Sequence, residues 1–293
     1  MRMKWVFRLI AGLFLSAWMA GTAQAQLPGP ALWEVRDGDA GLVIMGSVHM
    51  LRPDTRWLRP EIGQRFDETA MLVLEIADLQ GAEAVTTPIV LRKGFYPPGQ
   101  SLADELSPDT FERAVSLAED LGAGGGGFVR MRPWLAGMVL TQLWAASHGY
   151  DPGAGVDRYF SRRAAAAGKP VIGLETVEEQ MDLLIEGLGD DGETMMKQTL
   201  GQLEDPGYMD ALVGGWLKGD MEALEQLMRE AFAGFPESHE VLIAARNRRW
   251  AEAIGDLLAT PGSAFVVVGA AHLVGPDNVL DLLEARGYTV TRQ

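Results

Sequence analysis

Two histidines of this chain end the same pattern of residues, more than two hundred positions apart. In each case an apolar run rich in β-branched residues (42–45 and 265–268) is followed by Gly, two further residues and a histidine, His49 or His272. Such runs are typical of buried strands, and the Gly marks a turn or a close approach of the backbone. Each histidine is therefore predicted just beyond the carboxyl end of a strand, where open α/β sheets bind their ligands.

Glu75 belongs to a third apolar run, residues 71–76, where a carboxylate is costly to bury unless it is paired or bound to a cation. Imidazole and carboxylate are common metal ligands, and three of them from different strand ends suit a catalytic ion with open positions for water. We therefore expect His49, Glu75 and His272 to hold one divalent transition metal; this donor set suits zinc and does not exclude manganese. The alternatives are histidines that only cap strands through hydrogen bonds, and a Glu75 that faces solvent from an edge strand.

A helix expected over residues 237–259 places Arg246 and Asn247 on its apolar face. A buried guanidinium must be paired, so Arg246 is a candidate to bind a carboxylate or to stabilise an oxyanion. The alternative for Arg246 is a structural salt bridge to Asp157 or Glu175.

Glu175 ends a predicted strand just before a helix, so it is either a helix cap or a general base. Asp157 is in the first turn of another expected helix, where an acid ordinarily stabilises the helix dipole. Asn247 and Ser47, next to the expected catalytic residues, are predicted to bind substrate. The patterns Gly-x-Ser-x-Gly, His-Glu-x-x-His and Gly-x-Gly-x-x-Gly do not occur, which argues against ordinary serine hydrolases, zincins and dinucleotide-binding proteins.

The remaining pattern predicts the elements that would hold these residues. Strands are expected at 33–36, 41–46, 71–76, 169–175, 263–269 and 288–292, with an Asp-Gly hairpin turn between the first two. Helices are expected at 60–70, 109–121, 133–148, 156–167 and 278–285 and over most of 177–259, while 77–108 is expected to be irregular. This order indicates one α/β domain over residues 26–293, with a central mixed sheet flanked by helices and a helical insertion at about 177–259.

The first 25 residues have the features of a secretory signal peptide. Three basic residues precede an apolar stretch, and Ala23-Gln24-Ala25 forms a cleavage site. The alternative is an uncleaved membrane anchor, because the apolar stretch is nearly long enough to span a bilayer. We expect a periplasmic or secreted protein that meets the membrane only through the signal peptide before cleavage.

The charge of the chain argues against nucleic acid as a partner. The whole chain has a net charge of −15, and without the three basic residues of the first 25 it has 22 basic and 40 acidic residues, a net charge of −18. Binding to phosphates requires a basic surface. An acidic balance also keeps an exported protein soluble, which is sufficient to explain the negative charge.

Short motifs spread over nearly the whole chain after residue 25 resemble one known family. They are Leu32-Trp33-Glu34-Val35, Gly46-Ser47-Val48-His49, Leu72-Val73-Leu74-Glu75, Arg132-Pro133-Trp134, Gly155-Val156-Asp157-Arg158-Tyr159-Phe160, Gly173-Leu174-Glu175-Thr176-x-x-Glu179-Gln180, Trp216-x-x-Gly219-Asp220, Arg246-Asn247-x-x-Trp250-Ala251 and Val268-Gly269-Ala270-Ala271-His272-Leu273-Val274-Gly275. In this order they resemble the TraB/GumN/Tiki-like proteins, in particular the bacterial exported GumN-type branch.

The resemblance implies a fold like that of erythromycin esterase and the ChaN-type haem-binding proteins. It also implies a shared site of two Gly-x-x-His motifs, a Glu and an Arg, which His49, His272, Glu75 and Arg246 match by position. The Tiki branch is described as metal-dependent proteases that use manganese or cobalt and cut secreted signalling proteins.

The residues and the resemblance together lead to two hypotheses of different kinds. The first is an exported metal-dependent hydrolase, a peptidase that acts on a peptide or a secreted protein. The second is a periplasmic binding or regulatory protein that holds a peptide, haem or metal without turnover.

Overall fold

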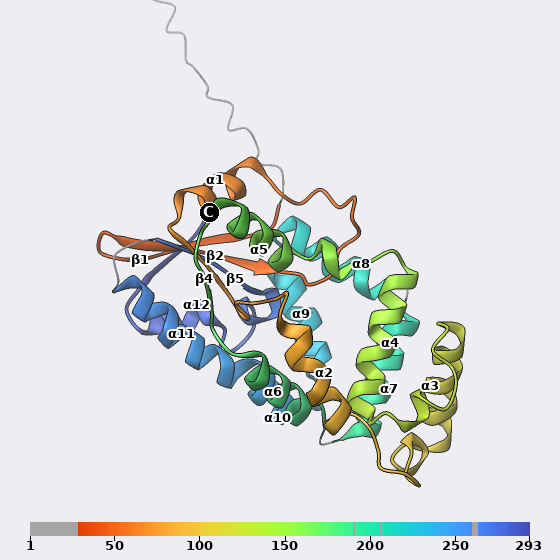
Figure 1. Cartoon of the computed structure of the whole chain (residues 1–293). Coiled ribbons are helices and arrows are strands. Elements are labelled where there is room, and N and C mark those ends of the chain that lie inside the picture. The colour runs from red at the N-terminus through yellow and green to blue at the C-terminus, as the bar shows by residue number, and fades with distance from the viewer. Residues whose placement is uncertain (1–28, 190, 206, 260–262) are drawn as a thin grey trace, which may run out of the picture.

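The computed structural model describes residues 29–189, 191–205, 207–259 and 263–293 (Figure 1). The predicted signal peptide, residues 1–25, lies outside this part of the chain. Within the described ranges, no helix is both long and apolar enough to cross a bilayer.

The centre of the fold is one mixed sheet of six strands, as expected from the sequence. Four neighbouring strands, β4-β3-β5-β2, run parallel, and β1 pairs antiparallel with both β2 and β6 at the other edge. The strands are β1 (Leu32–Asp37), β2 (Ala40–Ser47), β3 (Met71–Leu74), β4 (Val171–Gly173), β5 (Ala264–Gly269) and β6 (Thr289–Arg292). The predicted hairpin between β1 and β2 is confirmed, with Gly38 at a positive φ of 56° in its turn.

Helices cover both faces of this sheet (Figure 1). On one face lie α11 (Ala245–Leu258), with Trp250 and Ile254, and α12 (Val279–Ala285), with Leu283, in one buried cluster with Val266 of β5. On the other face, α1 (Pro60–Glu68) and α5 (Val156–Ala167) pack Phe66 and Phe160 against Phe265. Neighbouring residues of β5 thus face opposite layers, which is why its sequence is apolar throughout.

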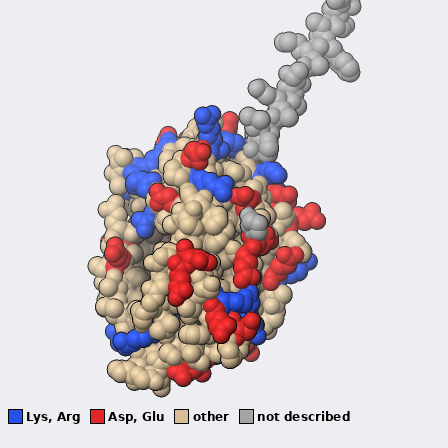
Figure 2. All heavy atoms as spheres, turned by 90° about the vertical axis from the view of Figure 1, so that its right-hand side faces the viewer, with Lys and Arg blue, Asp and Glu red and all other residues tan. Residues whose placement is uncertain are grey.

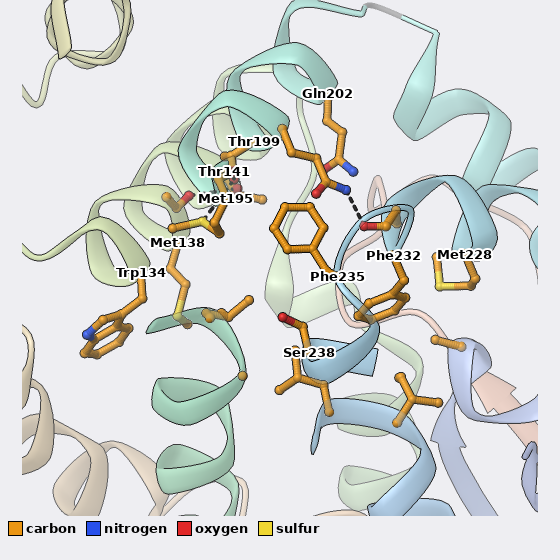
Figure 3. A pocket seen from close by; sticks show the side chains of 18 of the residues that line it. Trp134, Met138, Thr141, Met195, Thr199, Gln202, Met228, Phe232, Phe235 and Ser238 are labelled. Carbon is orange, nitrogen blue, oxygen red and sulfur yellow. Dashed lines mark hydrogen bonds between the residues drawn. The ribbon is translucent and has the colours of Figure 1, made fainter. Parts of the chain in front are cut away.

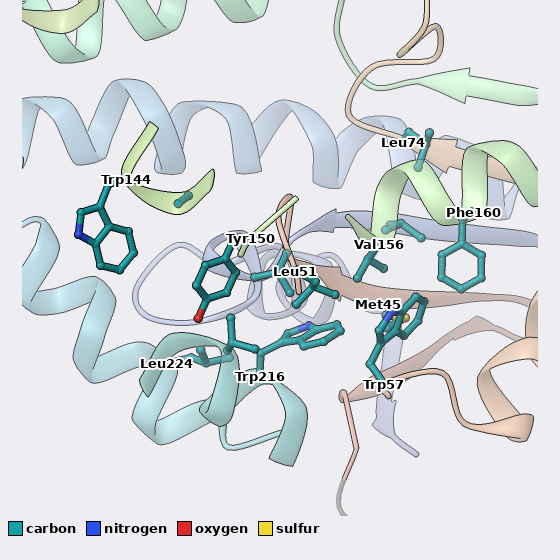
Figure 4. Packing of buried hydrophobic residues seen from close by; sticks show 14 of the residues in the cluster. Met45, Leu51, Trp57, Leu74, Trp144, Tyr150, Val156, Phe160, Trp216 and Leu224 are labelled. Atoms are coloured by element: carbon teal, nitrogen blue, oxygen red, sulfur yellow. The ribbon is translucent and has the colours of Figure 1, made fainter. Parts of the chain in front are cut away.

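A helical region lies beside the sheet and continues the core of the α1 and α5 face. It contains α2 (Ala82–Lys93), α3 (Pro108–Asp120), α4 (Pro133–Ser147), α6 (Val177–Gly189), α7 (Gly192–Glu204), α8 (Tyr208–Lys218), α9 (Met221–Ala231) and α10 (Pro236–His239). Figure 4 shows Trp216 of α8 near Trp57, Leu51 and Val156 in this core. Trp216 Nε1 also donates to Gly46 O at 2.9 Å, so the helical region is tied to the end of β2.

Three predicted elements differ from the structure. The helix α2 lies within residues 77–108, which were expected to be irregular; Pro88 inside it and its weak apolar periodicity conceal it in the sequence. The strand predicted over 71–76 ends at Leu74, so Glu75 follows the strand instead of lying inside it. The helix predicted over 237–259 is divided into α10, a π-helical turn (Glu240–Ala244) and α11.

Acidic side chains are conspicuous on the side of the molecule formed by the helical region. Figure 2 shows them over the middle of this face, interspersed with basic side chains, and uncharged residues cover most of the remainder. This distribution agrees with the net negative charge of the chain.

Candidate functional site

The predicted site residues meet at the carboxyl ends of β2, β3 and β5, around Gly269. Gly269 N donates to Glu75 Oε1 at 2.7 Å, and the position that a Cβ would take on Gly269 is 3.2 Å from Glu75 Oε1. The same position is 3.7 Å from His49 Nε2 and 3.5 Å from His272 Cδ2. The missing side chain of Gly269 therefore leaves a small space that is shared by His49, Glu75 and His272.

His272 is buried, and its neighbours fix its tautomer. Asn247 Nδ2 donates to Asp277 O at 2.9 Å, so Asn247 Oδ1 faces His272 Nδ1, at 2.6 Å, and must accept its proton. His272 Nε2 then carries the lone pair, 3.2 Å from Arg246 Nη1 and 4.0 Å from Glu75 Oε1. Burial, outweighing the attraction of Glu75, lowers the pKa of His272 to about 3, so its imidazole is neutral.

His49 lies on the open side of the site, and its side chain is 61% exposed. Its Nδ1 is 3.6 Å from Asp157 Oδ2, which directs Nε2 toward Gly269. Desolvation by the surrounding groups lowers the pKa of His49, but the carboxylates of Asp157 and Glu75 outweigh it and raise the pKa to about 9. Without a bound metal, His49 is therefore protonated at neutral pH.

Glu75 is ionised although it is largely buried. Its Oε1 accepts the Gly269 amide, and its Oε2 accepts from Arg246 Nη2 at 2.9 Å and from Gln180 Nε2 at 3.2 Å. Burial raises the pKa of Glu75, but His272, His49, Arg246 and the Gly269 amide together lower it to about 2. Glu75 thus joins the two histidines to the arginine.

Arg246 and Glu175 form a bidentate pair inside the protein, with side chains only 8% and 2% exposed. Arg246 Nε donates to Glu175 Oε2 at 3.1 Å, and Nη2 donates to Glu175 Oε1 at 2.5 Å. Arg246 Nη1 donates to Leu242 O at 3.0 Å and also faces His272 Nε2. With the bond from Nη2 to Glu75, all five N–H groups of Arg246 have acceptors. Of the two salt-bridge partners expected for Arg246, the structure has Glu175, while Asp157 lies beside His49.

The two predicted substrate-binding residues, Ser47 and Asn247, differ in whether their side-chain polar atoms already have hydrogen-bond partners. Ser47 is buried at the end of β2, in register with Gly269, and its Oγ has no hydrogen-bond partner among the described residues. Asn247 is fully buried, and both ends of its amide are used, by His272 and by Asp277 O. Asn247 therefore orients His272, whereas Ser47 has an unused polar atom on the same face of the sheet as the space at Gly269.

Two residues of the site were not assigned to it from the sequence. Gln180 donates to Glu75 Oε2 and to Glu175 Oε1, at 3.2 and 3.1 Å, and so connects the two carboxylates. It directly follows Glu179, which forms a capping box with Thr176 at the start of α6. Nothing in the sequence indicates where the Gln180 side chain points. Asp157 was considered as a helix-start acid and as an alternative partner of Arg246, but it is in position to orient His49.

The side chains around Gly269 are of the types that bind divalent cations, but the distances between them are not yet those of a metal site. Each histidine turns Nδ1 toward an oxygen, as metal-ligating histidines usually do. His49 Nε2 faces the space at Gly269, whereas His272 Nε2 accepts from Arg246 Nη1 at 3.2 Å. Two donors that share one ion at about 2.1 Å each lie at most about 4.2 Å apart, and His272 Nε2 and Glu75 Oε1 are 4.0 Å apart. As the side chains stand, no group of three or more His, Asp or Glu among the described residues is arranged as a metal site.

Comparison with known proteins gives relatives of similar length. An uncharacterized protein of Treponema pallidum (strain Nichols) is 24% identical over 269 residues, covering 87% of this chain and 80% of that protein. The uncharacterized protein YbaP of Escherichia coli K12 is 24% identical over 255 residues, covering 87% of this chain and 92% of YbaP. YbaP of Shigella flexneri matches to the same extent. No solved structure matches the chain.

The profile of one protein family matches the chain from residue 31 to residue 292, which includes every strand of the sheet and every residue of the site described above. The chain belongs to the TraB/PrgY/gumN family.

Proposed function

We propose that this protein is an exported metal-dependent hydrolase that cleaves peptide bonds. The observation that carries the proposal is the convergence of the two histidines on the ionised Glu75: His49 Nε2 and the Cδ2 edge of His272 both face the space at Gly269, and His272 Nε2 lies 4.0 Å from Glu75 Oε1. His49 Nε2, His272 Nε2 and Glu75 Oε1 would hold one manganese, cobalt or zinc ion. Such an ion supplies Lewis acidity and a nucleophilic water at neutral pH.

Arg246 provides the positive charge that an oxyanion needs. Its Nη1 lies 3.2 Å from His272 Nε2. The lone pair of His272 Nε2 can therefore accept a hydrogen bond from Arg246 or bind a ligand on the side of Glu75, but not both. When a ligand takes that lone pair, one N–H of Arg246 becomes free to donate to the oxygen of a substrate carbonyl. Arg246 is held for this purpose by Glu175, Glu75 and Leu242 O.

Glu175 was predicted as a general base, and its contacts favour another role. Both of its oxygens accept from Arg246, and its side chain is 2% exposed, so it has no direct access to a substrate proton. We therefore propose that Glu175 positions Arg246. Ser47 Oγ, buried and without a partner among the described residues, would donate to a group of the bound substrate.

The location and partners of the protein are part of the same proposal. We propose that residues 1–25 direct export and are removed, and that the substrate is a peptide or a secreted protein in the periplasm or outside the cell. N-terminal sequencing of the protein recovered from the periplasm of a Gram-negative host tests this; the expected first residue is Gln26. Recovery of the intact amino terminus in the membrane fraction would contradict it.

The alternative, a periplasmic protein that binds a ligand without turnover, has one observation in its favour. Arg246 pairs with both Glu75 and Glu175, so each of these buried charges already has a partner of opposite charge without a metal. A site of this kind can hold a peptide, haem or metal ligand and need not react with it.

The first experiment compares metal content in the mature protein and in three variants. Residues 26–293 are incubated with manganese, cobalt and zinc, passed through a desalting column and analysed by elemental mass spectrometry. We expect about one equivalent of metal in the wild type, and loss of it in His49→Ala and His272→Gln. His148→Ala is the matched control, since His148 is exposed at the end of α4, away from the site.

Circular dichroism establishes that each variant is folded, and a library of internally quenched peptides then reports cleavage. Turnover that disappears on chelation and returns with metal supports the hydrolase. If the wild type retains none of the three metals, the hydrolase has no nucleophile and the proposal fails. Stoichiometric uptake of a peptide or of haem without product would establish the binding protein instead.

A further inference from the structure

A cavity lies among the helices of the helical region, next to the candidate site. Its volume is about 480 Å³, within the range of small-ligand sites. Long and aromatic apolar side chains dominate its lining and converge on it from helices on different sides (Figure 3), among them Met138, Met195, Met228, Phe232 and Phe235. We call it the methionine cavity.

The methionine cavity shares a wall with the site. Met50 directly follows His49, Ala271 directly precedes His272, and both line the cavity. Leu242 lines it as well, and its carbonyl accepts the hydrogen bond from Arg246 Nη1. A chain bound with one peptide bond over Gly269 therefore has a neighbouring side chain within reach of the cavity.

The lining offers apolar surface that the protein itself does not cover. Met138, Met195, Met228 and Phe232 are each only partly buried. Covering such surface is favourable in proportion to the apolar area that leaves water. Because methionine is unbranched and polarizable, this lining can adapt to apolar side chains of different shapes.

The lining of the cavity, as far as the structure describes it, offers no cation to an acidic ligand group. Of the described residues that line it, Asp191 alone is charged. Its carboxylate caps α7, accepting from Thr194 N at 2.9 Å and from Thr194 Oγ1 at 2.6 Å. An acidic ligand group would thus lose its hydration without gaining a cation, which is unfavourable.

Amide groups among the lining residues distinguish a peptide from a lipid chain. Gln142 and Gln202 line the cavity, and their side-chain amides make no hydrogen bond to the part of the chain that the structure describes. The side chain of Gln198, by contrast, donates to Ala231 O. A free side-chain amide has both donors and an acceptor, which match the N–H and C=O groups of an extended peptide. An acyl chain has no such groups along its length.

We propose that the methionine cavity is a specificity subsite that takes a bulky, uncharged apolar side chain of an extended polypeptide. This inference rests on the proposed peptidase and names its substrate class: chains with Phe, Met or Leu beside the bond to be cut. Gln142 and Gln202 would bind the backbone on either side of that residue.

The test measures binding to the metal-free mature protein, so that it does not depend on turnover. Fluorescein-labelled peptides of ten residues, built from Gly, Ser and Thr with Phe, Met or Asp at the centre, are titrated by fluorescence anisotropy. Burial of one large apolar side chain predicts that the Phe and Met peptides bind roughly 10- to 100-fold more tightly than the Asp peptide. Laurate as a competitor distinguishes a peptide site from a lipid site.

Two variants act on the cavity itself. Met138→Glu places a carboxylate in the lining, and Ser238→Phe fills part of the space; both positions are half-buried. Each should abolish most of the preference for the Phe peptide over the Asp peptide. Leu91→Glu is the matched control, because Leu91 is 66% exposed on α2 and does not line the cavity.

Equal affinity for the Phe and Asp peptides would overturn the proposal, and so would an unchanged preference in folded Met138→Glu and Ser238→Phe. Displacement of the Phe peptide by micromolar laurate would assign the cavity to acyl chains and would also overturn it. The binding results can be separated from the tests of the peptidase. If only the subsite proposal is wrong, the protein still retains metal and cleaves peptides but shows no preference for the Phe peptide. If only the peptidase proposal is wrong, the preference for the Phe peptide is seen without metal retention or cleavage.

Discussion

His272 Nδ1 and Asn247 Oδ1 are joined by a buried hydrogen bond of 2.6 Å, and the bond from Asn247 Nδ2 to Asp277 O fixes which atom of the amide faces the ring. The neighbouring residue, Arg246, meets the other nitrogen of the same imidazole. Two successive residues of α11 thus determine the tautomer and the orientation of His272.

Asn247→Leu should therefore disturb His272 without touching the space at Gly269. It leaves the Nδ1–H buried without an acceptor, which costs roughly 1–3 kcal/mol of the free energy of unfolding, and it should lower metal affinity by about 10- to 100-fold. Urea unfolding and metal titration measure the two effects. Asn247→Asp keeps an acceptor and should retain more of the affinity; equal affinity in the Leu and Asp variants would argue against this role.

Arg246→Met should leave the carboxylates of Glu75 and Glu175 buried without their cation. The expected loss is roughly 3–5 kcal/mol of the free energy of unfolding, because a broken buried pair leaves an uncompensated charge. Arg248→Met on the same helix is the control: Arg248 pairs with Glu240 at the surface, so its loss should cost at most about 1 kcal/mol. Similar losses for the two variants in urea unfolding would contradict the buried network.

Gly269→Ala should block the site with little effect on the fold. The φ of Gly269 is −51°, which alanine adopts readily, but the added methyl group would lie 3.2 Å from Glu75 Oε1 and near both histidines. We expect metal binding to weaken at least about tenfold, while the free energy of unfolding falls by roughly 1–3 kcal/mol, the usual cost of an extra methyl group in a packed place. Gly214→Ala, in α8 with open space around it, is the control for the substitution and should leave metal binding unchanged.

Glu193 makes part of the stability depend on pH at a position far from the site. At the start of α7 it accepts from Ser107 and Thr110 of the neighbouring helix start and pairs with Lys197. Burial raises the pKa of Glu193, but Lys197, Ser107 and Thr110 outweigh it and lower the pKa from its ordinary 4.5 to about 2. The carboxylate therefore stabilises the fold fully above pH 4.5, and this contribution is lost as the pH falls toward 2.

Glu193→Gln should accordingly cost roughly 1–3 kcal/mol at pH 7, and the difference from the wild type should shrink below pH 4.5. Urea unfolding at a series of pH values gives both quantities. Glu284→Gln, at an exposed position of α12, serves as the control. A difference that stays constant down to pH 3 would show that the charge of Glu193 does not contribute.

The positions of His49 and His272 were predictable because each follows a local pattern in the sequence: an apolar run, then Gly, two residues and the histidine. Glu75 was noticeable only as a carboxylate in an apolar run, and the sequence did not show that its strand ends at Leu74. The pairing of Arg246 was predictable only as a choice between Glu175 and Asp157, since an apolar helix face shows that a partner is needed without showing which acid is near. Gln180 gave no signal, because its role depends on the packing of α6 against the sheet.

The mixed sheet was predictable from the alternation of strands and helices, whereas α2 was not, because Pro88 and its weak periodicity resemble a loop. The division at the π-helical turn was equally hidden. Its consequence is local and functional: Leu242 O, in that turn, accepts from Arg246 Nη1.

The strand order also determines when the protein can fold. β5, the third strand in the order β4-β3-β5-β2-β1-β6, begins only at residue 264 of 293. Until this segment is available, β2 and β3 have no strand between them and both main core clusters lack their shared centre. The sheet and the two main core clusters therefore cannot be completed until nearly the whole chain has been made. The same order delays the assembly of the candidate site, because His272 is the last of its residues to be made, so a chain that ends before β5 lacks one of the two histidines and the Gly269 amide that binds Glu75.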